Sequence, residues 1–192
     1  MAFIVKESGE SNIPLVEEGV HQAICYALYD LGTHYSEKFD KWSHQCLIAW
    51  ELPDIRFTNK DGDDVPRVVS KKYTLSLGEK SNLRKDLQSW RGKVFTADEL
   101  LGFDLTSILG SNCMIQIIHT SKDGKTYANI GSIIPCLKSV PTKVPENKLI
   151  KFSLDEDAPI PEGIPAWIKA IILDSKELSS ADSQESSEVT PF

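Results

Sequence analysis

Residues 68–92 read VVSKKYTLSLGEKSNLRKDLQSWRG, and the period of the apolar residues changes within this stretch. Up to Leu77 the apolar residues alternate with polar ones, which is typical of a β-strand with one buried face. After Gly78 they recur at the spacing of a helix, at Leu83, Leu87 and Trp90. We therefore expect a strand over residues 68–77 that leads into a helix over residues 79–90, which Gly92 terminates.

Two more strands are expected before this stretch. The first covers residues 21–30, where apolar residues alternate, and Leu31-Gly32-Thr33 is expected to end it. The second covers residues 43–52, and Pro53 is expected to end it because proline lacks the N–H group that a sheet needs. A polar loop at residues 59–64 then leads toward the strand at 68–77.

A β-hairpin is the strongest prediction after the helix. Its strands are expected at residues 112–120 and 125–135, and Asp123-Gly124 between them favours a tight turn because glycine tolerates positive φ. Before the hairpin, Thr96 with Glu99 three residues later has the pattern of a capping box at the start of a short helix. After it, we expect an edge strand over residues 149–153 and a helix over residues 161–173.

This order of elements favours a mainly β fold, a five-stranded OB-fold-like Greek-key barrel. The helix between strands 3 and 4 would plug one end of the closed sheet. A split barrel or an α+β sandwich would have the same order. The expected division is an OB-fold-like domain at 1–153, a C-terminal arm with a helix at 154–174, and a disordered, Ser-rich acidic tail at 175–192.

Composition and spacing exclude several classes of protein. The longest apolar runs, residues 113–118 and 168–173, are too short to span a membrane, and residues 1–10 lack the apolar core of a signal peptide. A cytoplasmic location is therefore expected. The four cysteines show no Cys-x-x-Cys spacing and no histidine at ligand spacing, so we expect reduced, mostly buried thiols and neither metal nor other cofactor.

The charge is distributed unevenly along the chain. The formal net charge is −7, which by itself argues against a phosphate-rich partner. Between Arg67 and Lys93, however, eight Lys or Arg residues are opposed only by Glu79 and Asp86. From residue 175 onward the chain is acidic instead. A basic middle and an acidic end indicate two separate functional regions.

The basic region contains aromatic residues, and cations together with ring faces are what single-stranded nucleic acid requires. The candidate contacts lie in the second and third strands, at the end of the helix and in the hairpin: Trp50, Arg56, Phe57, Lys71, Lys72, Tyr73, Arg91, Lys122, Lys125 and Tyr127. Burial in the core is the alternative for Trp50, which is in phase with Ile48, and for Tyr73, which is in phase with Leu75.

The C-terminus and the middle of the chain each show a resemblance. The last residues, Glu188-Val189-Thr190-Pro191-Phe192, resemble the end of bacterial single-stranded DNA-binding proteins, whose acidic tails finish in Ile-Pro-Phe; here Thr190 replaces the Ile and there are fewer acids. Residues 70–92 and 124–130 resemble a family of small phage-encoded proteins found among replication and recombination genes. The first resemblance implies that Pro191 and Phe192 dock on partner proteins.

Together these observations predict non-sequence-specific binding and protection of single-stranded DNA. The resemblances imply a role in phage DNA replication, recombination or repair inside a bacterial host, with partner proteins recruited by the tail; a homo-oligomer is left open. One alternative is a recombination mediator or adaptor that binds DNA weakly. The other is a nuclease or nucleotide-processing enzyme, for which Asp61, Asp63 and Asp64 would be the metal ligands, although this run is also typical of a polar turn. We expect no enzyme and no membrane partner.

Overall fold

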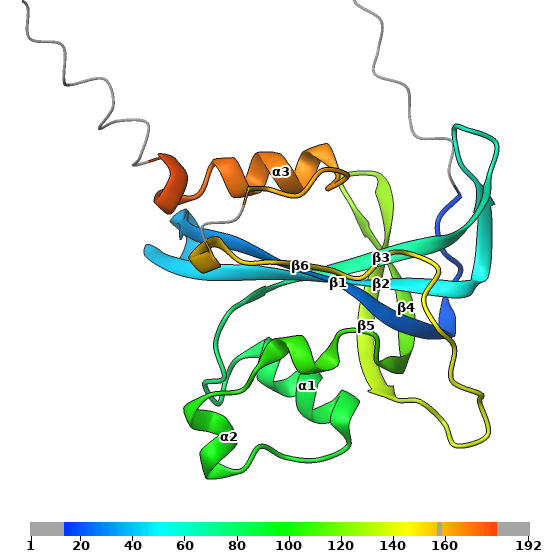
Figure 1. Ribbon diagram of the computed structural model, residues 1–192, viewed down its shortest axis with the longest axis horizontal. Coiled ribbons are helices and arrows are strands. Elements are labelled where there is room, and N and C mark those ends of the chain that lie inside the picture. The colour runs from blue at the N-terminus through cyan, green and yellow to red at the C-terminus, as the bar shows by residue number, and fades with distance from the viewer. Residues whose placement is uncertain (1–13, 157–158, 180–192) are drawn as a thin grey trace, which may run out of the picture.

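The computed structural model describes residues 14–156 and 159–179. A single sheet runs through the middle of the molecule, with helix α3 on one face and helices α1 and α2 on the other, as Figure 1 shows. The prediction of a mainly β fold is confirmed. Within the described residues, no helix is long and apolar enough to cross a membrane.

The sheet contains six strands. In chain order they are β1 (Gly19–Ser36), β2 (Lys41–Thr58), β3 (Asp64–Thr74), β4 (Asn112–Lys122), β5 (Lys125–Pro135) and β6 (Ile150–Phe152). The order across the sheet is β3-β2-β1-β4-β5 with antiparallel neighbours, and β6 pairs in parallel with β1. The described residues form no ladder between β3 and β5, so the sheet is open, whereas the sequence predicts a closed sheet of five strands.

The helices are short and their ends follow local signals. They are α1 (Asn82–Arg91), α2 (Ala97–Leu101) and α3 (Ala166–Leu173), with 3-10 turns η1 (Glu37–Phe39), η2 (Leu105–Ile108) and η3 (Leu154–Glu156). The hydroxyl of Ser81 caps α1, which therefore begins later than predicted. The predicted capping box at Thr96 and Glu99 is confirmed. Helix α3 begins only after Pro165, not at residue 161.

Strands β1 and β2 are both longer than predicted. The residues that were expected to end them lie at register shifts, after which the strand continues. In β1 the register shifts between Asp30 and Gly32, and Gly32 has φ of +78°. In β2 the register shifts between Leu52 and Arg56, so that Pro53 lies where no regular ladder bond is needed. Strand β1 therefore continues to Ser36 and β2 to Thr58.

The two faces of the central strands are both buried. One set of β1 and β2 side chains, including Cys25, Cys46 and Trp50, packs with Leu87 of α1 in the larger core. The alternate set, including Tyr29 and Leu47, packs under α3 in the second core. Strand β3 and the β4–β5 hairpin, in contrast, alternate between buried and exposed residues over much of their length.

The predicted tail begins too early. Ser175 is fully buried, and the N–H of Ser179 donates to its carbonyl in a short helical turn. Leu178 packs against the second core. Residues 175–179 therefore belong to the folded structure, while the predicted disorder after Ser179 and the Pro191-Phe192 motif lie outside the described residues.

Candidate nucleic-acid interface

A groove of about 700 Å³ lies between the end of β3 and the start of α1. Strand β3 stops at Thr74 and the chain turns through residues 75–81 before the helix begins. This turn brings lysines of distant segments together around the groove: Lys41, Lys71, Lys72 and Lys80. Glu79 is the one acidic residue among the described residues that line it. We call this the lysine groove.

The N-terminus of α1 adds to the positive potential. The helix begins at Asn82, which lines the groove together with its cap, Ser81. Free backbone N–H groups and the helix dipole favour an anion at this position. The first turn of α1 contains no acidic side chain that would take the place of such an anion.

Three of the four lysines have no counter-ion among the described residues. Lys71 donates to Asp86 of α1 at 2.7 Å, which neutralises its charge. Lys41, Lys72 and Lys80 are exposed, and no salt bridge within the described part of the chain involves any of them. These three ammonium groups are therefore available to a phosphate backbone.

A second hollow, of about 310 Å³, lies where β3 and β5 face each other without pairing. Residues 67–70 of β3 and residues 127–130 of β5 line it, together with Leu15 and Val16. Tyr127 is 46% exposed. Because residues 71–74 of the same strand line the lysine groove, β3 carries the two hollows one after the other along its length.

The structure places two predicted aromatic contacts in the core instead. Trp50 is completely buried, with its ring centroid 5.9 Å from that of Trp90. Tyr73 is buried too, and its phenol donates to Asp86 at 2.7 Å. Burial, with help from the Asp86 charge, raises the pKa of Tyr73. Neither ring can stack on a base, and both assignments as contacts are corrected.

Two other predicted cations, Arg56 and Arg91, form ion pairs within the protein. Arg56 forms ion pairs with Asp64 and with Glu146, and hydrogen bonds to those two groups raise its pKa. Arg91 pairs with Glu99, and its guanidinium lies 4.4 Å from the ring centroid of Phe95. Arg91 therefore joins α1 to the segment around α2, and its role as a nucleic-acid contact stays a prediction.

The remaining predicted residues lie at the surface in separate places. Phe57 is half-buried, with the Arg67 guanidinium 5.1 Å from its ring centroid. Lys122 and Lys125 pair across the tip of the β4–β5 hairpin and are exposed. Neither of them lines the lysine groove. Of the predicted set, Lys71, Lys72 and Tyr73 border the groove and Tyr127 borders the second hollow.

Two lysines that line the groove, Lys41 and Lys80, are not among the predicted contacts. Lys41 starts β2 and lies well before the basic stretch, so charge counting did not find it. The alternation of cations and rings in Lys38-Phe39-Asp40-Lys41-Trp42 is the signal that would have drawn attention to it. Lys80 reads as part of a solvated helix face, but it lies before α1 begins and so lines the groove.

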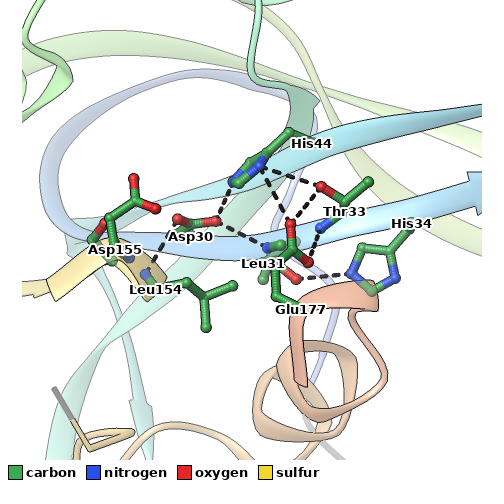
Figure 2. Close-up of polar contacts among 10 residues, drawn as sticks. Asp30, Leu31, Thr33, His34, His44, Leu154, Asp155 and Glu177 are labelled. Atoms are coloured by element: carbon green, nitrogen blue, oxygen red, sulfur yellow. Dashed lines mark hydrogen bonds and ion pairs between the residues drawn. The ribbon is translucent and has the colours of Figure 1, made fainter. Parts of the chain in front are cut away.

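A polar cluster fixes the C-terminal segment against the β1–β2 hairpin (Figure 2). His44 Nε2 lies 2.6 Å from Asp30, and its Nδ1 lies 3.8 Å from Glu177. Glu177 also accepts hydrogen bonds from the N–H of Thr33 at 2.8 Å and from its hydroxyl at 2.6 Å. Although burial opposes the effect, these hydrogen bonds and the His44 charge lower the pKa of Glu177. The cluster holds residues 175–179 in place.

Of the three aspartates proposed as metal ligands under the enzyme alternative, Asp61 and Asp63 lie in the turn before β3, and Asp64 is the first residue of that strand. The N–H groups of Asp61 and Asp63 both donate to the side chain of Asn59 at 2.9 Å. Asp64 accepts from Arg56. Across residues 14–156 and 159–179, no group of three or more His, Cys, Asp or Glu side chains is placed to hold a metal ion.

Comparison with protein-family models found no match for this chain, and comparison with curated proteins also found none. The function therefore has to be argued from the surface that the fold creates, and above all from the lysine groove.

Proposed function

We propose that this protein binds single-stranded DNA without sequence preference, with the phosphate backbone held in the lysine groove. One observation carries the proposal. Three exposed lysines, Lys41, Lys72 and Lys80, share one groove and have no counter-ion in the part of the chain that the structure describes, although the net charge of the chain is −7. Local concentration of cations, and not the overall charge, determines where a polyanion binds.

The order of the strands supports an OB-like interpretation of the fold. The sequence β3-β2-β1-β4-β5 is that of an OB barrel unrolled between its third and fifth strands, and α1 plugs the larger core from one side. OB folds bind oligonucleotides on strands 2 and 3 and on the adjoining loops. The lysine groove lies on β3 and next to the start of β2, which is where such a ligand would bind.

A single strand suits this surface better than a duplex. Its bases are free to leave the stack and to contact apolar or aromatic side chains. The hollow between β3 and β5 offers Tyr127 and Val68 for this purpose, the latter 41% exposed. A duplex presents its phosphates but keeps its bases paired, so it would use only the electrostatic part of the site.

The test compares a fluorescent oligo-dT with a matched duplex at two salt concentrations. We expect a preference for the single strand, weakened by salt. Lys72→Glu/Lys80→Glu should lower the affinity for oligo-dT about tenfold or more and reduce the salt slope by about 0.7 for each lost phosphate contact. The control, Lys60→Glu/Lys169→Glu, changes the net charge equally at exposed positions outside the groove. Equal affinity of the two double variants, or a preference for duplex, would overturn the proposal.

We also propose, from the resemblance of the C-terminus, that the last residues recruit replication, recombination or repair proteins to coated DNA in a phage-infected cell. A motif that tethers a partner to the bound strand raises the local concentration of that partner. Deletion of Pro191 and Phe192 should leave oligo-dT affinity unchanged and abolish co-purification of these proteins. Undiminished co-purification by the shortened chain would reject the docking role.

A further inference from the structure

Three aromatic rings are exposed where β1 turns into β2, at residues 35–42, which we call the β1–β2 turn. Phe39 is 64% exposed, Trp42 is 53% exposed and Tyr35 is 46% exposed. Large apolar side chains at the surface leave transfer free energy unrealised, and a cluster of them commonly marks a binding site. None of the three belongs to either buried core.

Local contacts hold the turn in one shape. Asp40 adopts a left-handed conformation with φ of 48°, and its N–H donates to the carbonyl of Glu37 at 3.3 Å. The phenol of Tyr35 donates to the carboxylate of Asp40. The rings of Tyr35 and Trp42 contact each other, with their centroids 5.4 Å apart. A turn that is held in this way loses little conformational entropy when a ligand binds.

Cations flank the most exposed ring. The ammonium groups of Lys38 and Lys41 lie 5.3 Å and 6.0 Å from the centroid of Phe39. Lys176 lies 5.2 Å from the centroid of Trp42, so that ring is partly covered by the C-terminal segment. Phe39 is the most exposed of the three rings, and its neighbours in the chain are two lysines, Lys38 and Lys41, and two acidic residues, Glu37 and Asp40.

The turn is continuous with the lysine groove. A hollow of about 220 Å³ is lined by residues of the turn and of the neighbouring strands: Ser36, Phe39, Lys41, Ser43, Gln45 and Thr74. Lys41 and Thr74 also line the lysine groove. A strand whose phosphates follow the groove therefore reaches Phe39 by way of Lys41, which lines both hollows.

We infer that Phe39 is a base-stacking site for the single strand held in the lysine groove, with Lys38 and Lys41 binding the phosphates on either side of the stacked base. The inference rests on the proposed function and adds the residue that contacts the bases. Ring faces stack on any base, so such a site provides affinity without sequence preference. The ammonium groups of Lys38 and Lys41 beside the ring favour a polyanion over a neutral apolar ligand.

The experiment separates stacking from charge by using two ligands, oligo-dT and a sugar-phosphate strand of the same length without bases. For Phe39→Ala we expect a loss of affinity for oligo-dT of roughly five- to a hundredfold and no change for the strand without bases. Phe39→Leu, which keeps an apolar side chain without a ring, should behave like Phe39→Ala. Phe39→Tyr should restore binding. Trp167→Ala, at an exposed ring on α3, is the control and should bind as the unmodified protein does.

The possible failures are distinguishable. If the unmodified protein binds neither ligand, the proposed function falls and this inference falls with it. If it binds oligo-dT, and if Lys72→Glu/Lys80→Glu weakens binding while Phe39→Ala does not, the groove stands and the stacking site is rejected. An equal loss by Phe39→Ala on both ligands would also reject it, because a stacked ring has nothing to contact on a strand without bases. The circular dichroism spectrum and urea midpoint of Phe39→Tyr check that the turn tolerates substitution.

Discussion

The phenol of Tyr73 donates a 2.7 Å hydrogen bond to the carboxylate of Asp86, and so ties the end of β3 to the middle of α1. The same carboxylate accepts from Lys71, also at 2.7 Å. These two contacts hold α1 beside β3, and the lysine groove lies between the end of that strand and the start of the helix. Tyr73 thus shapes the candidate site from within the core.

Tyr73→Phe should destabilise the fold by about 1 kcal/mol, since one buried hydrogen bond is lost while Lys71 still satisfies Asp86. The urea midpoint measures this change. Affinity for oligo-dT should stay within about twofold, because the ring is buried and only positions the helix. A loss of affinity above tenfold with unchanged stability would mean that the tyrosine contacts DNA directly.

Glu51 should be essential for stability although it lies far from the groove. It is fully buried and accepts from the N–H of Glu146 and of Asn147, both at 2.9 Å, and from the Asn147 amide at 2.7 Å. Glu51→Ala leaves these donors without a partner and should cost about 2–5 kcal/mol in urea unfolding. Asp54→Asn, which breaks an exposed ion pair with Lys143, should cost less than about 1 kcal/mol. Similar losses in the two variants would contradict the structural role of Glu51.

Substitution of Gly32 should destabilise the protein for two reasons. Comparison with Gly62→Ala separates them. Its φ of +78° strains any other residue, and an added Cβ would lie 2.5 Å from the Cβ of Ser175. Gly62 has a similar φ of +90° with nothing within 4 Å of an added Cβ. Gly62→Ala should therefore cost about 1 kcal/mol, whereas Gly32→Ala should cost clearly more and loosen residues 175–179. Thermal unfolding and limited proteolysis measure the two effects, and equal behaviour would argue against the close approach.

Acid should weaken the attachment of the C-terminal segment. The folded-state pKa of Glu177 lies below its ordinary value of 4.5. A carboxylate with a lowered pKa contributes stability above its unfolded pKa, and this contribution disappears as the pH falls through the folded value. The stability difference between the unmodified chain and Glu177→Gln should therefore be present at pH 7 and shrink as the pH falls below 4.5 toward the folded-state pKa. A difference that does not shrink in acid would contradict the ionic role of Glu177.

The thiols should differ sharply in reactivity. Burial raises the pKa of Cys25 and of Cys46 to about 12 and also raises that of Cys113, while Cys136 is the only one of the four that is not buried. In the native protein at pH 8, iodoacetamide should label Cys136 first and the other three only after unfolding, because the thiolate is the reactive form. Mass spectrometry of the unmodified protein and of Cys136→Ser checks this order. Rapid native labelling of Cys25 would show that the larger core opens.

Local patterns were sufficient for several elements. The change of period at Gly78 predicted the passage from β3 to α1, and the capping box at Thr96 predicted the start of α2. The β4–β5 hairpin has a two-residue turn in which Asp123 and Gly124 both have positive φ, as its dipeptide predicted. Each of these features depends only on residues that are neighbours along the chain, so a short stretch of sequence is sufficient to predict it.

The contacts between distant segments were not accessible in this way. Alternation places Trp50 and Tyr73 on one face of their strands, but it does not say that α1 covers that face, nor that α3 covers the opposite one. For the same reason the basic stretch indicated a polyanion site but not its members. Lys41 joins Lys72 and Lys80 only through the pairing of β2 with β3 and the position of α1. The sequence by itself determined the elements and the excess of cations, while long-range packing decided which rings are buried and which lysines share a groove.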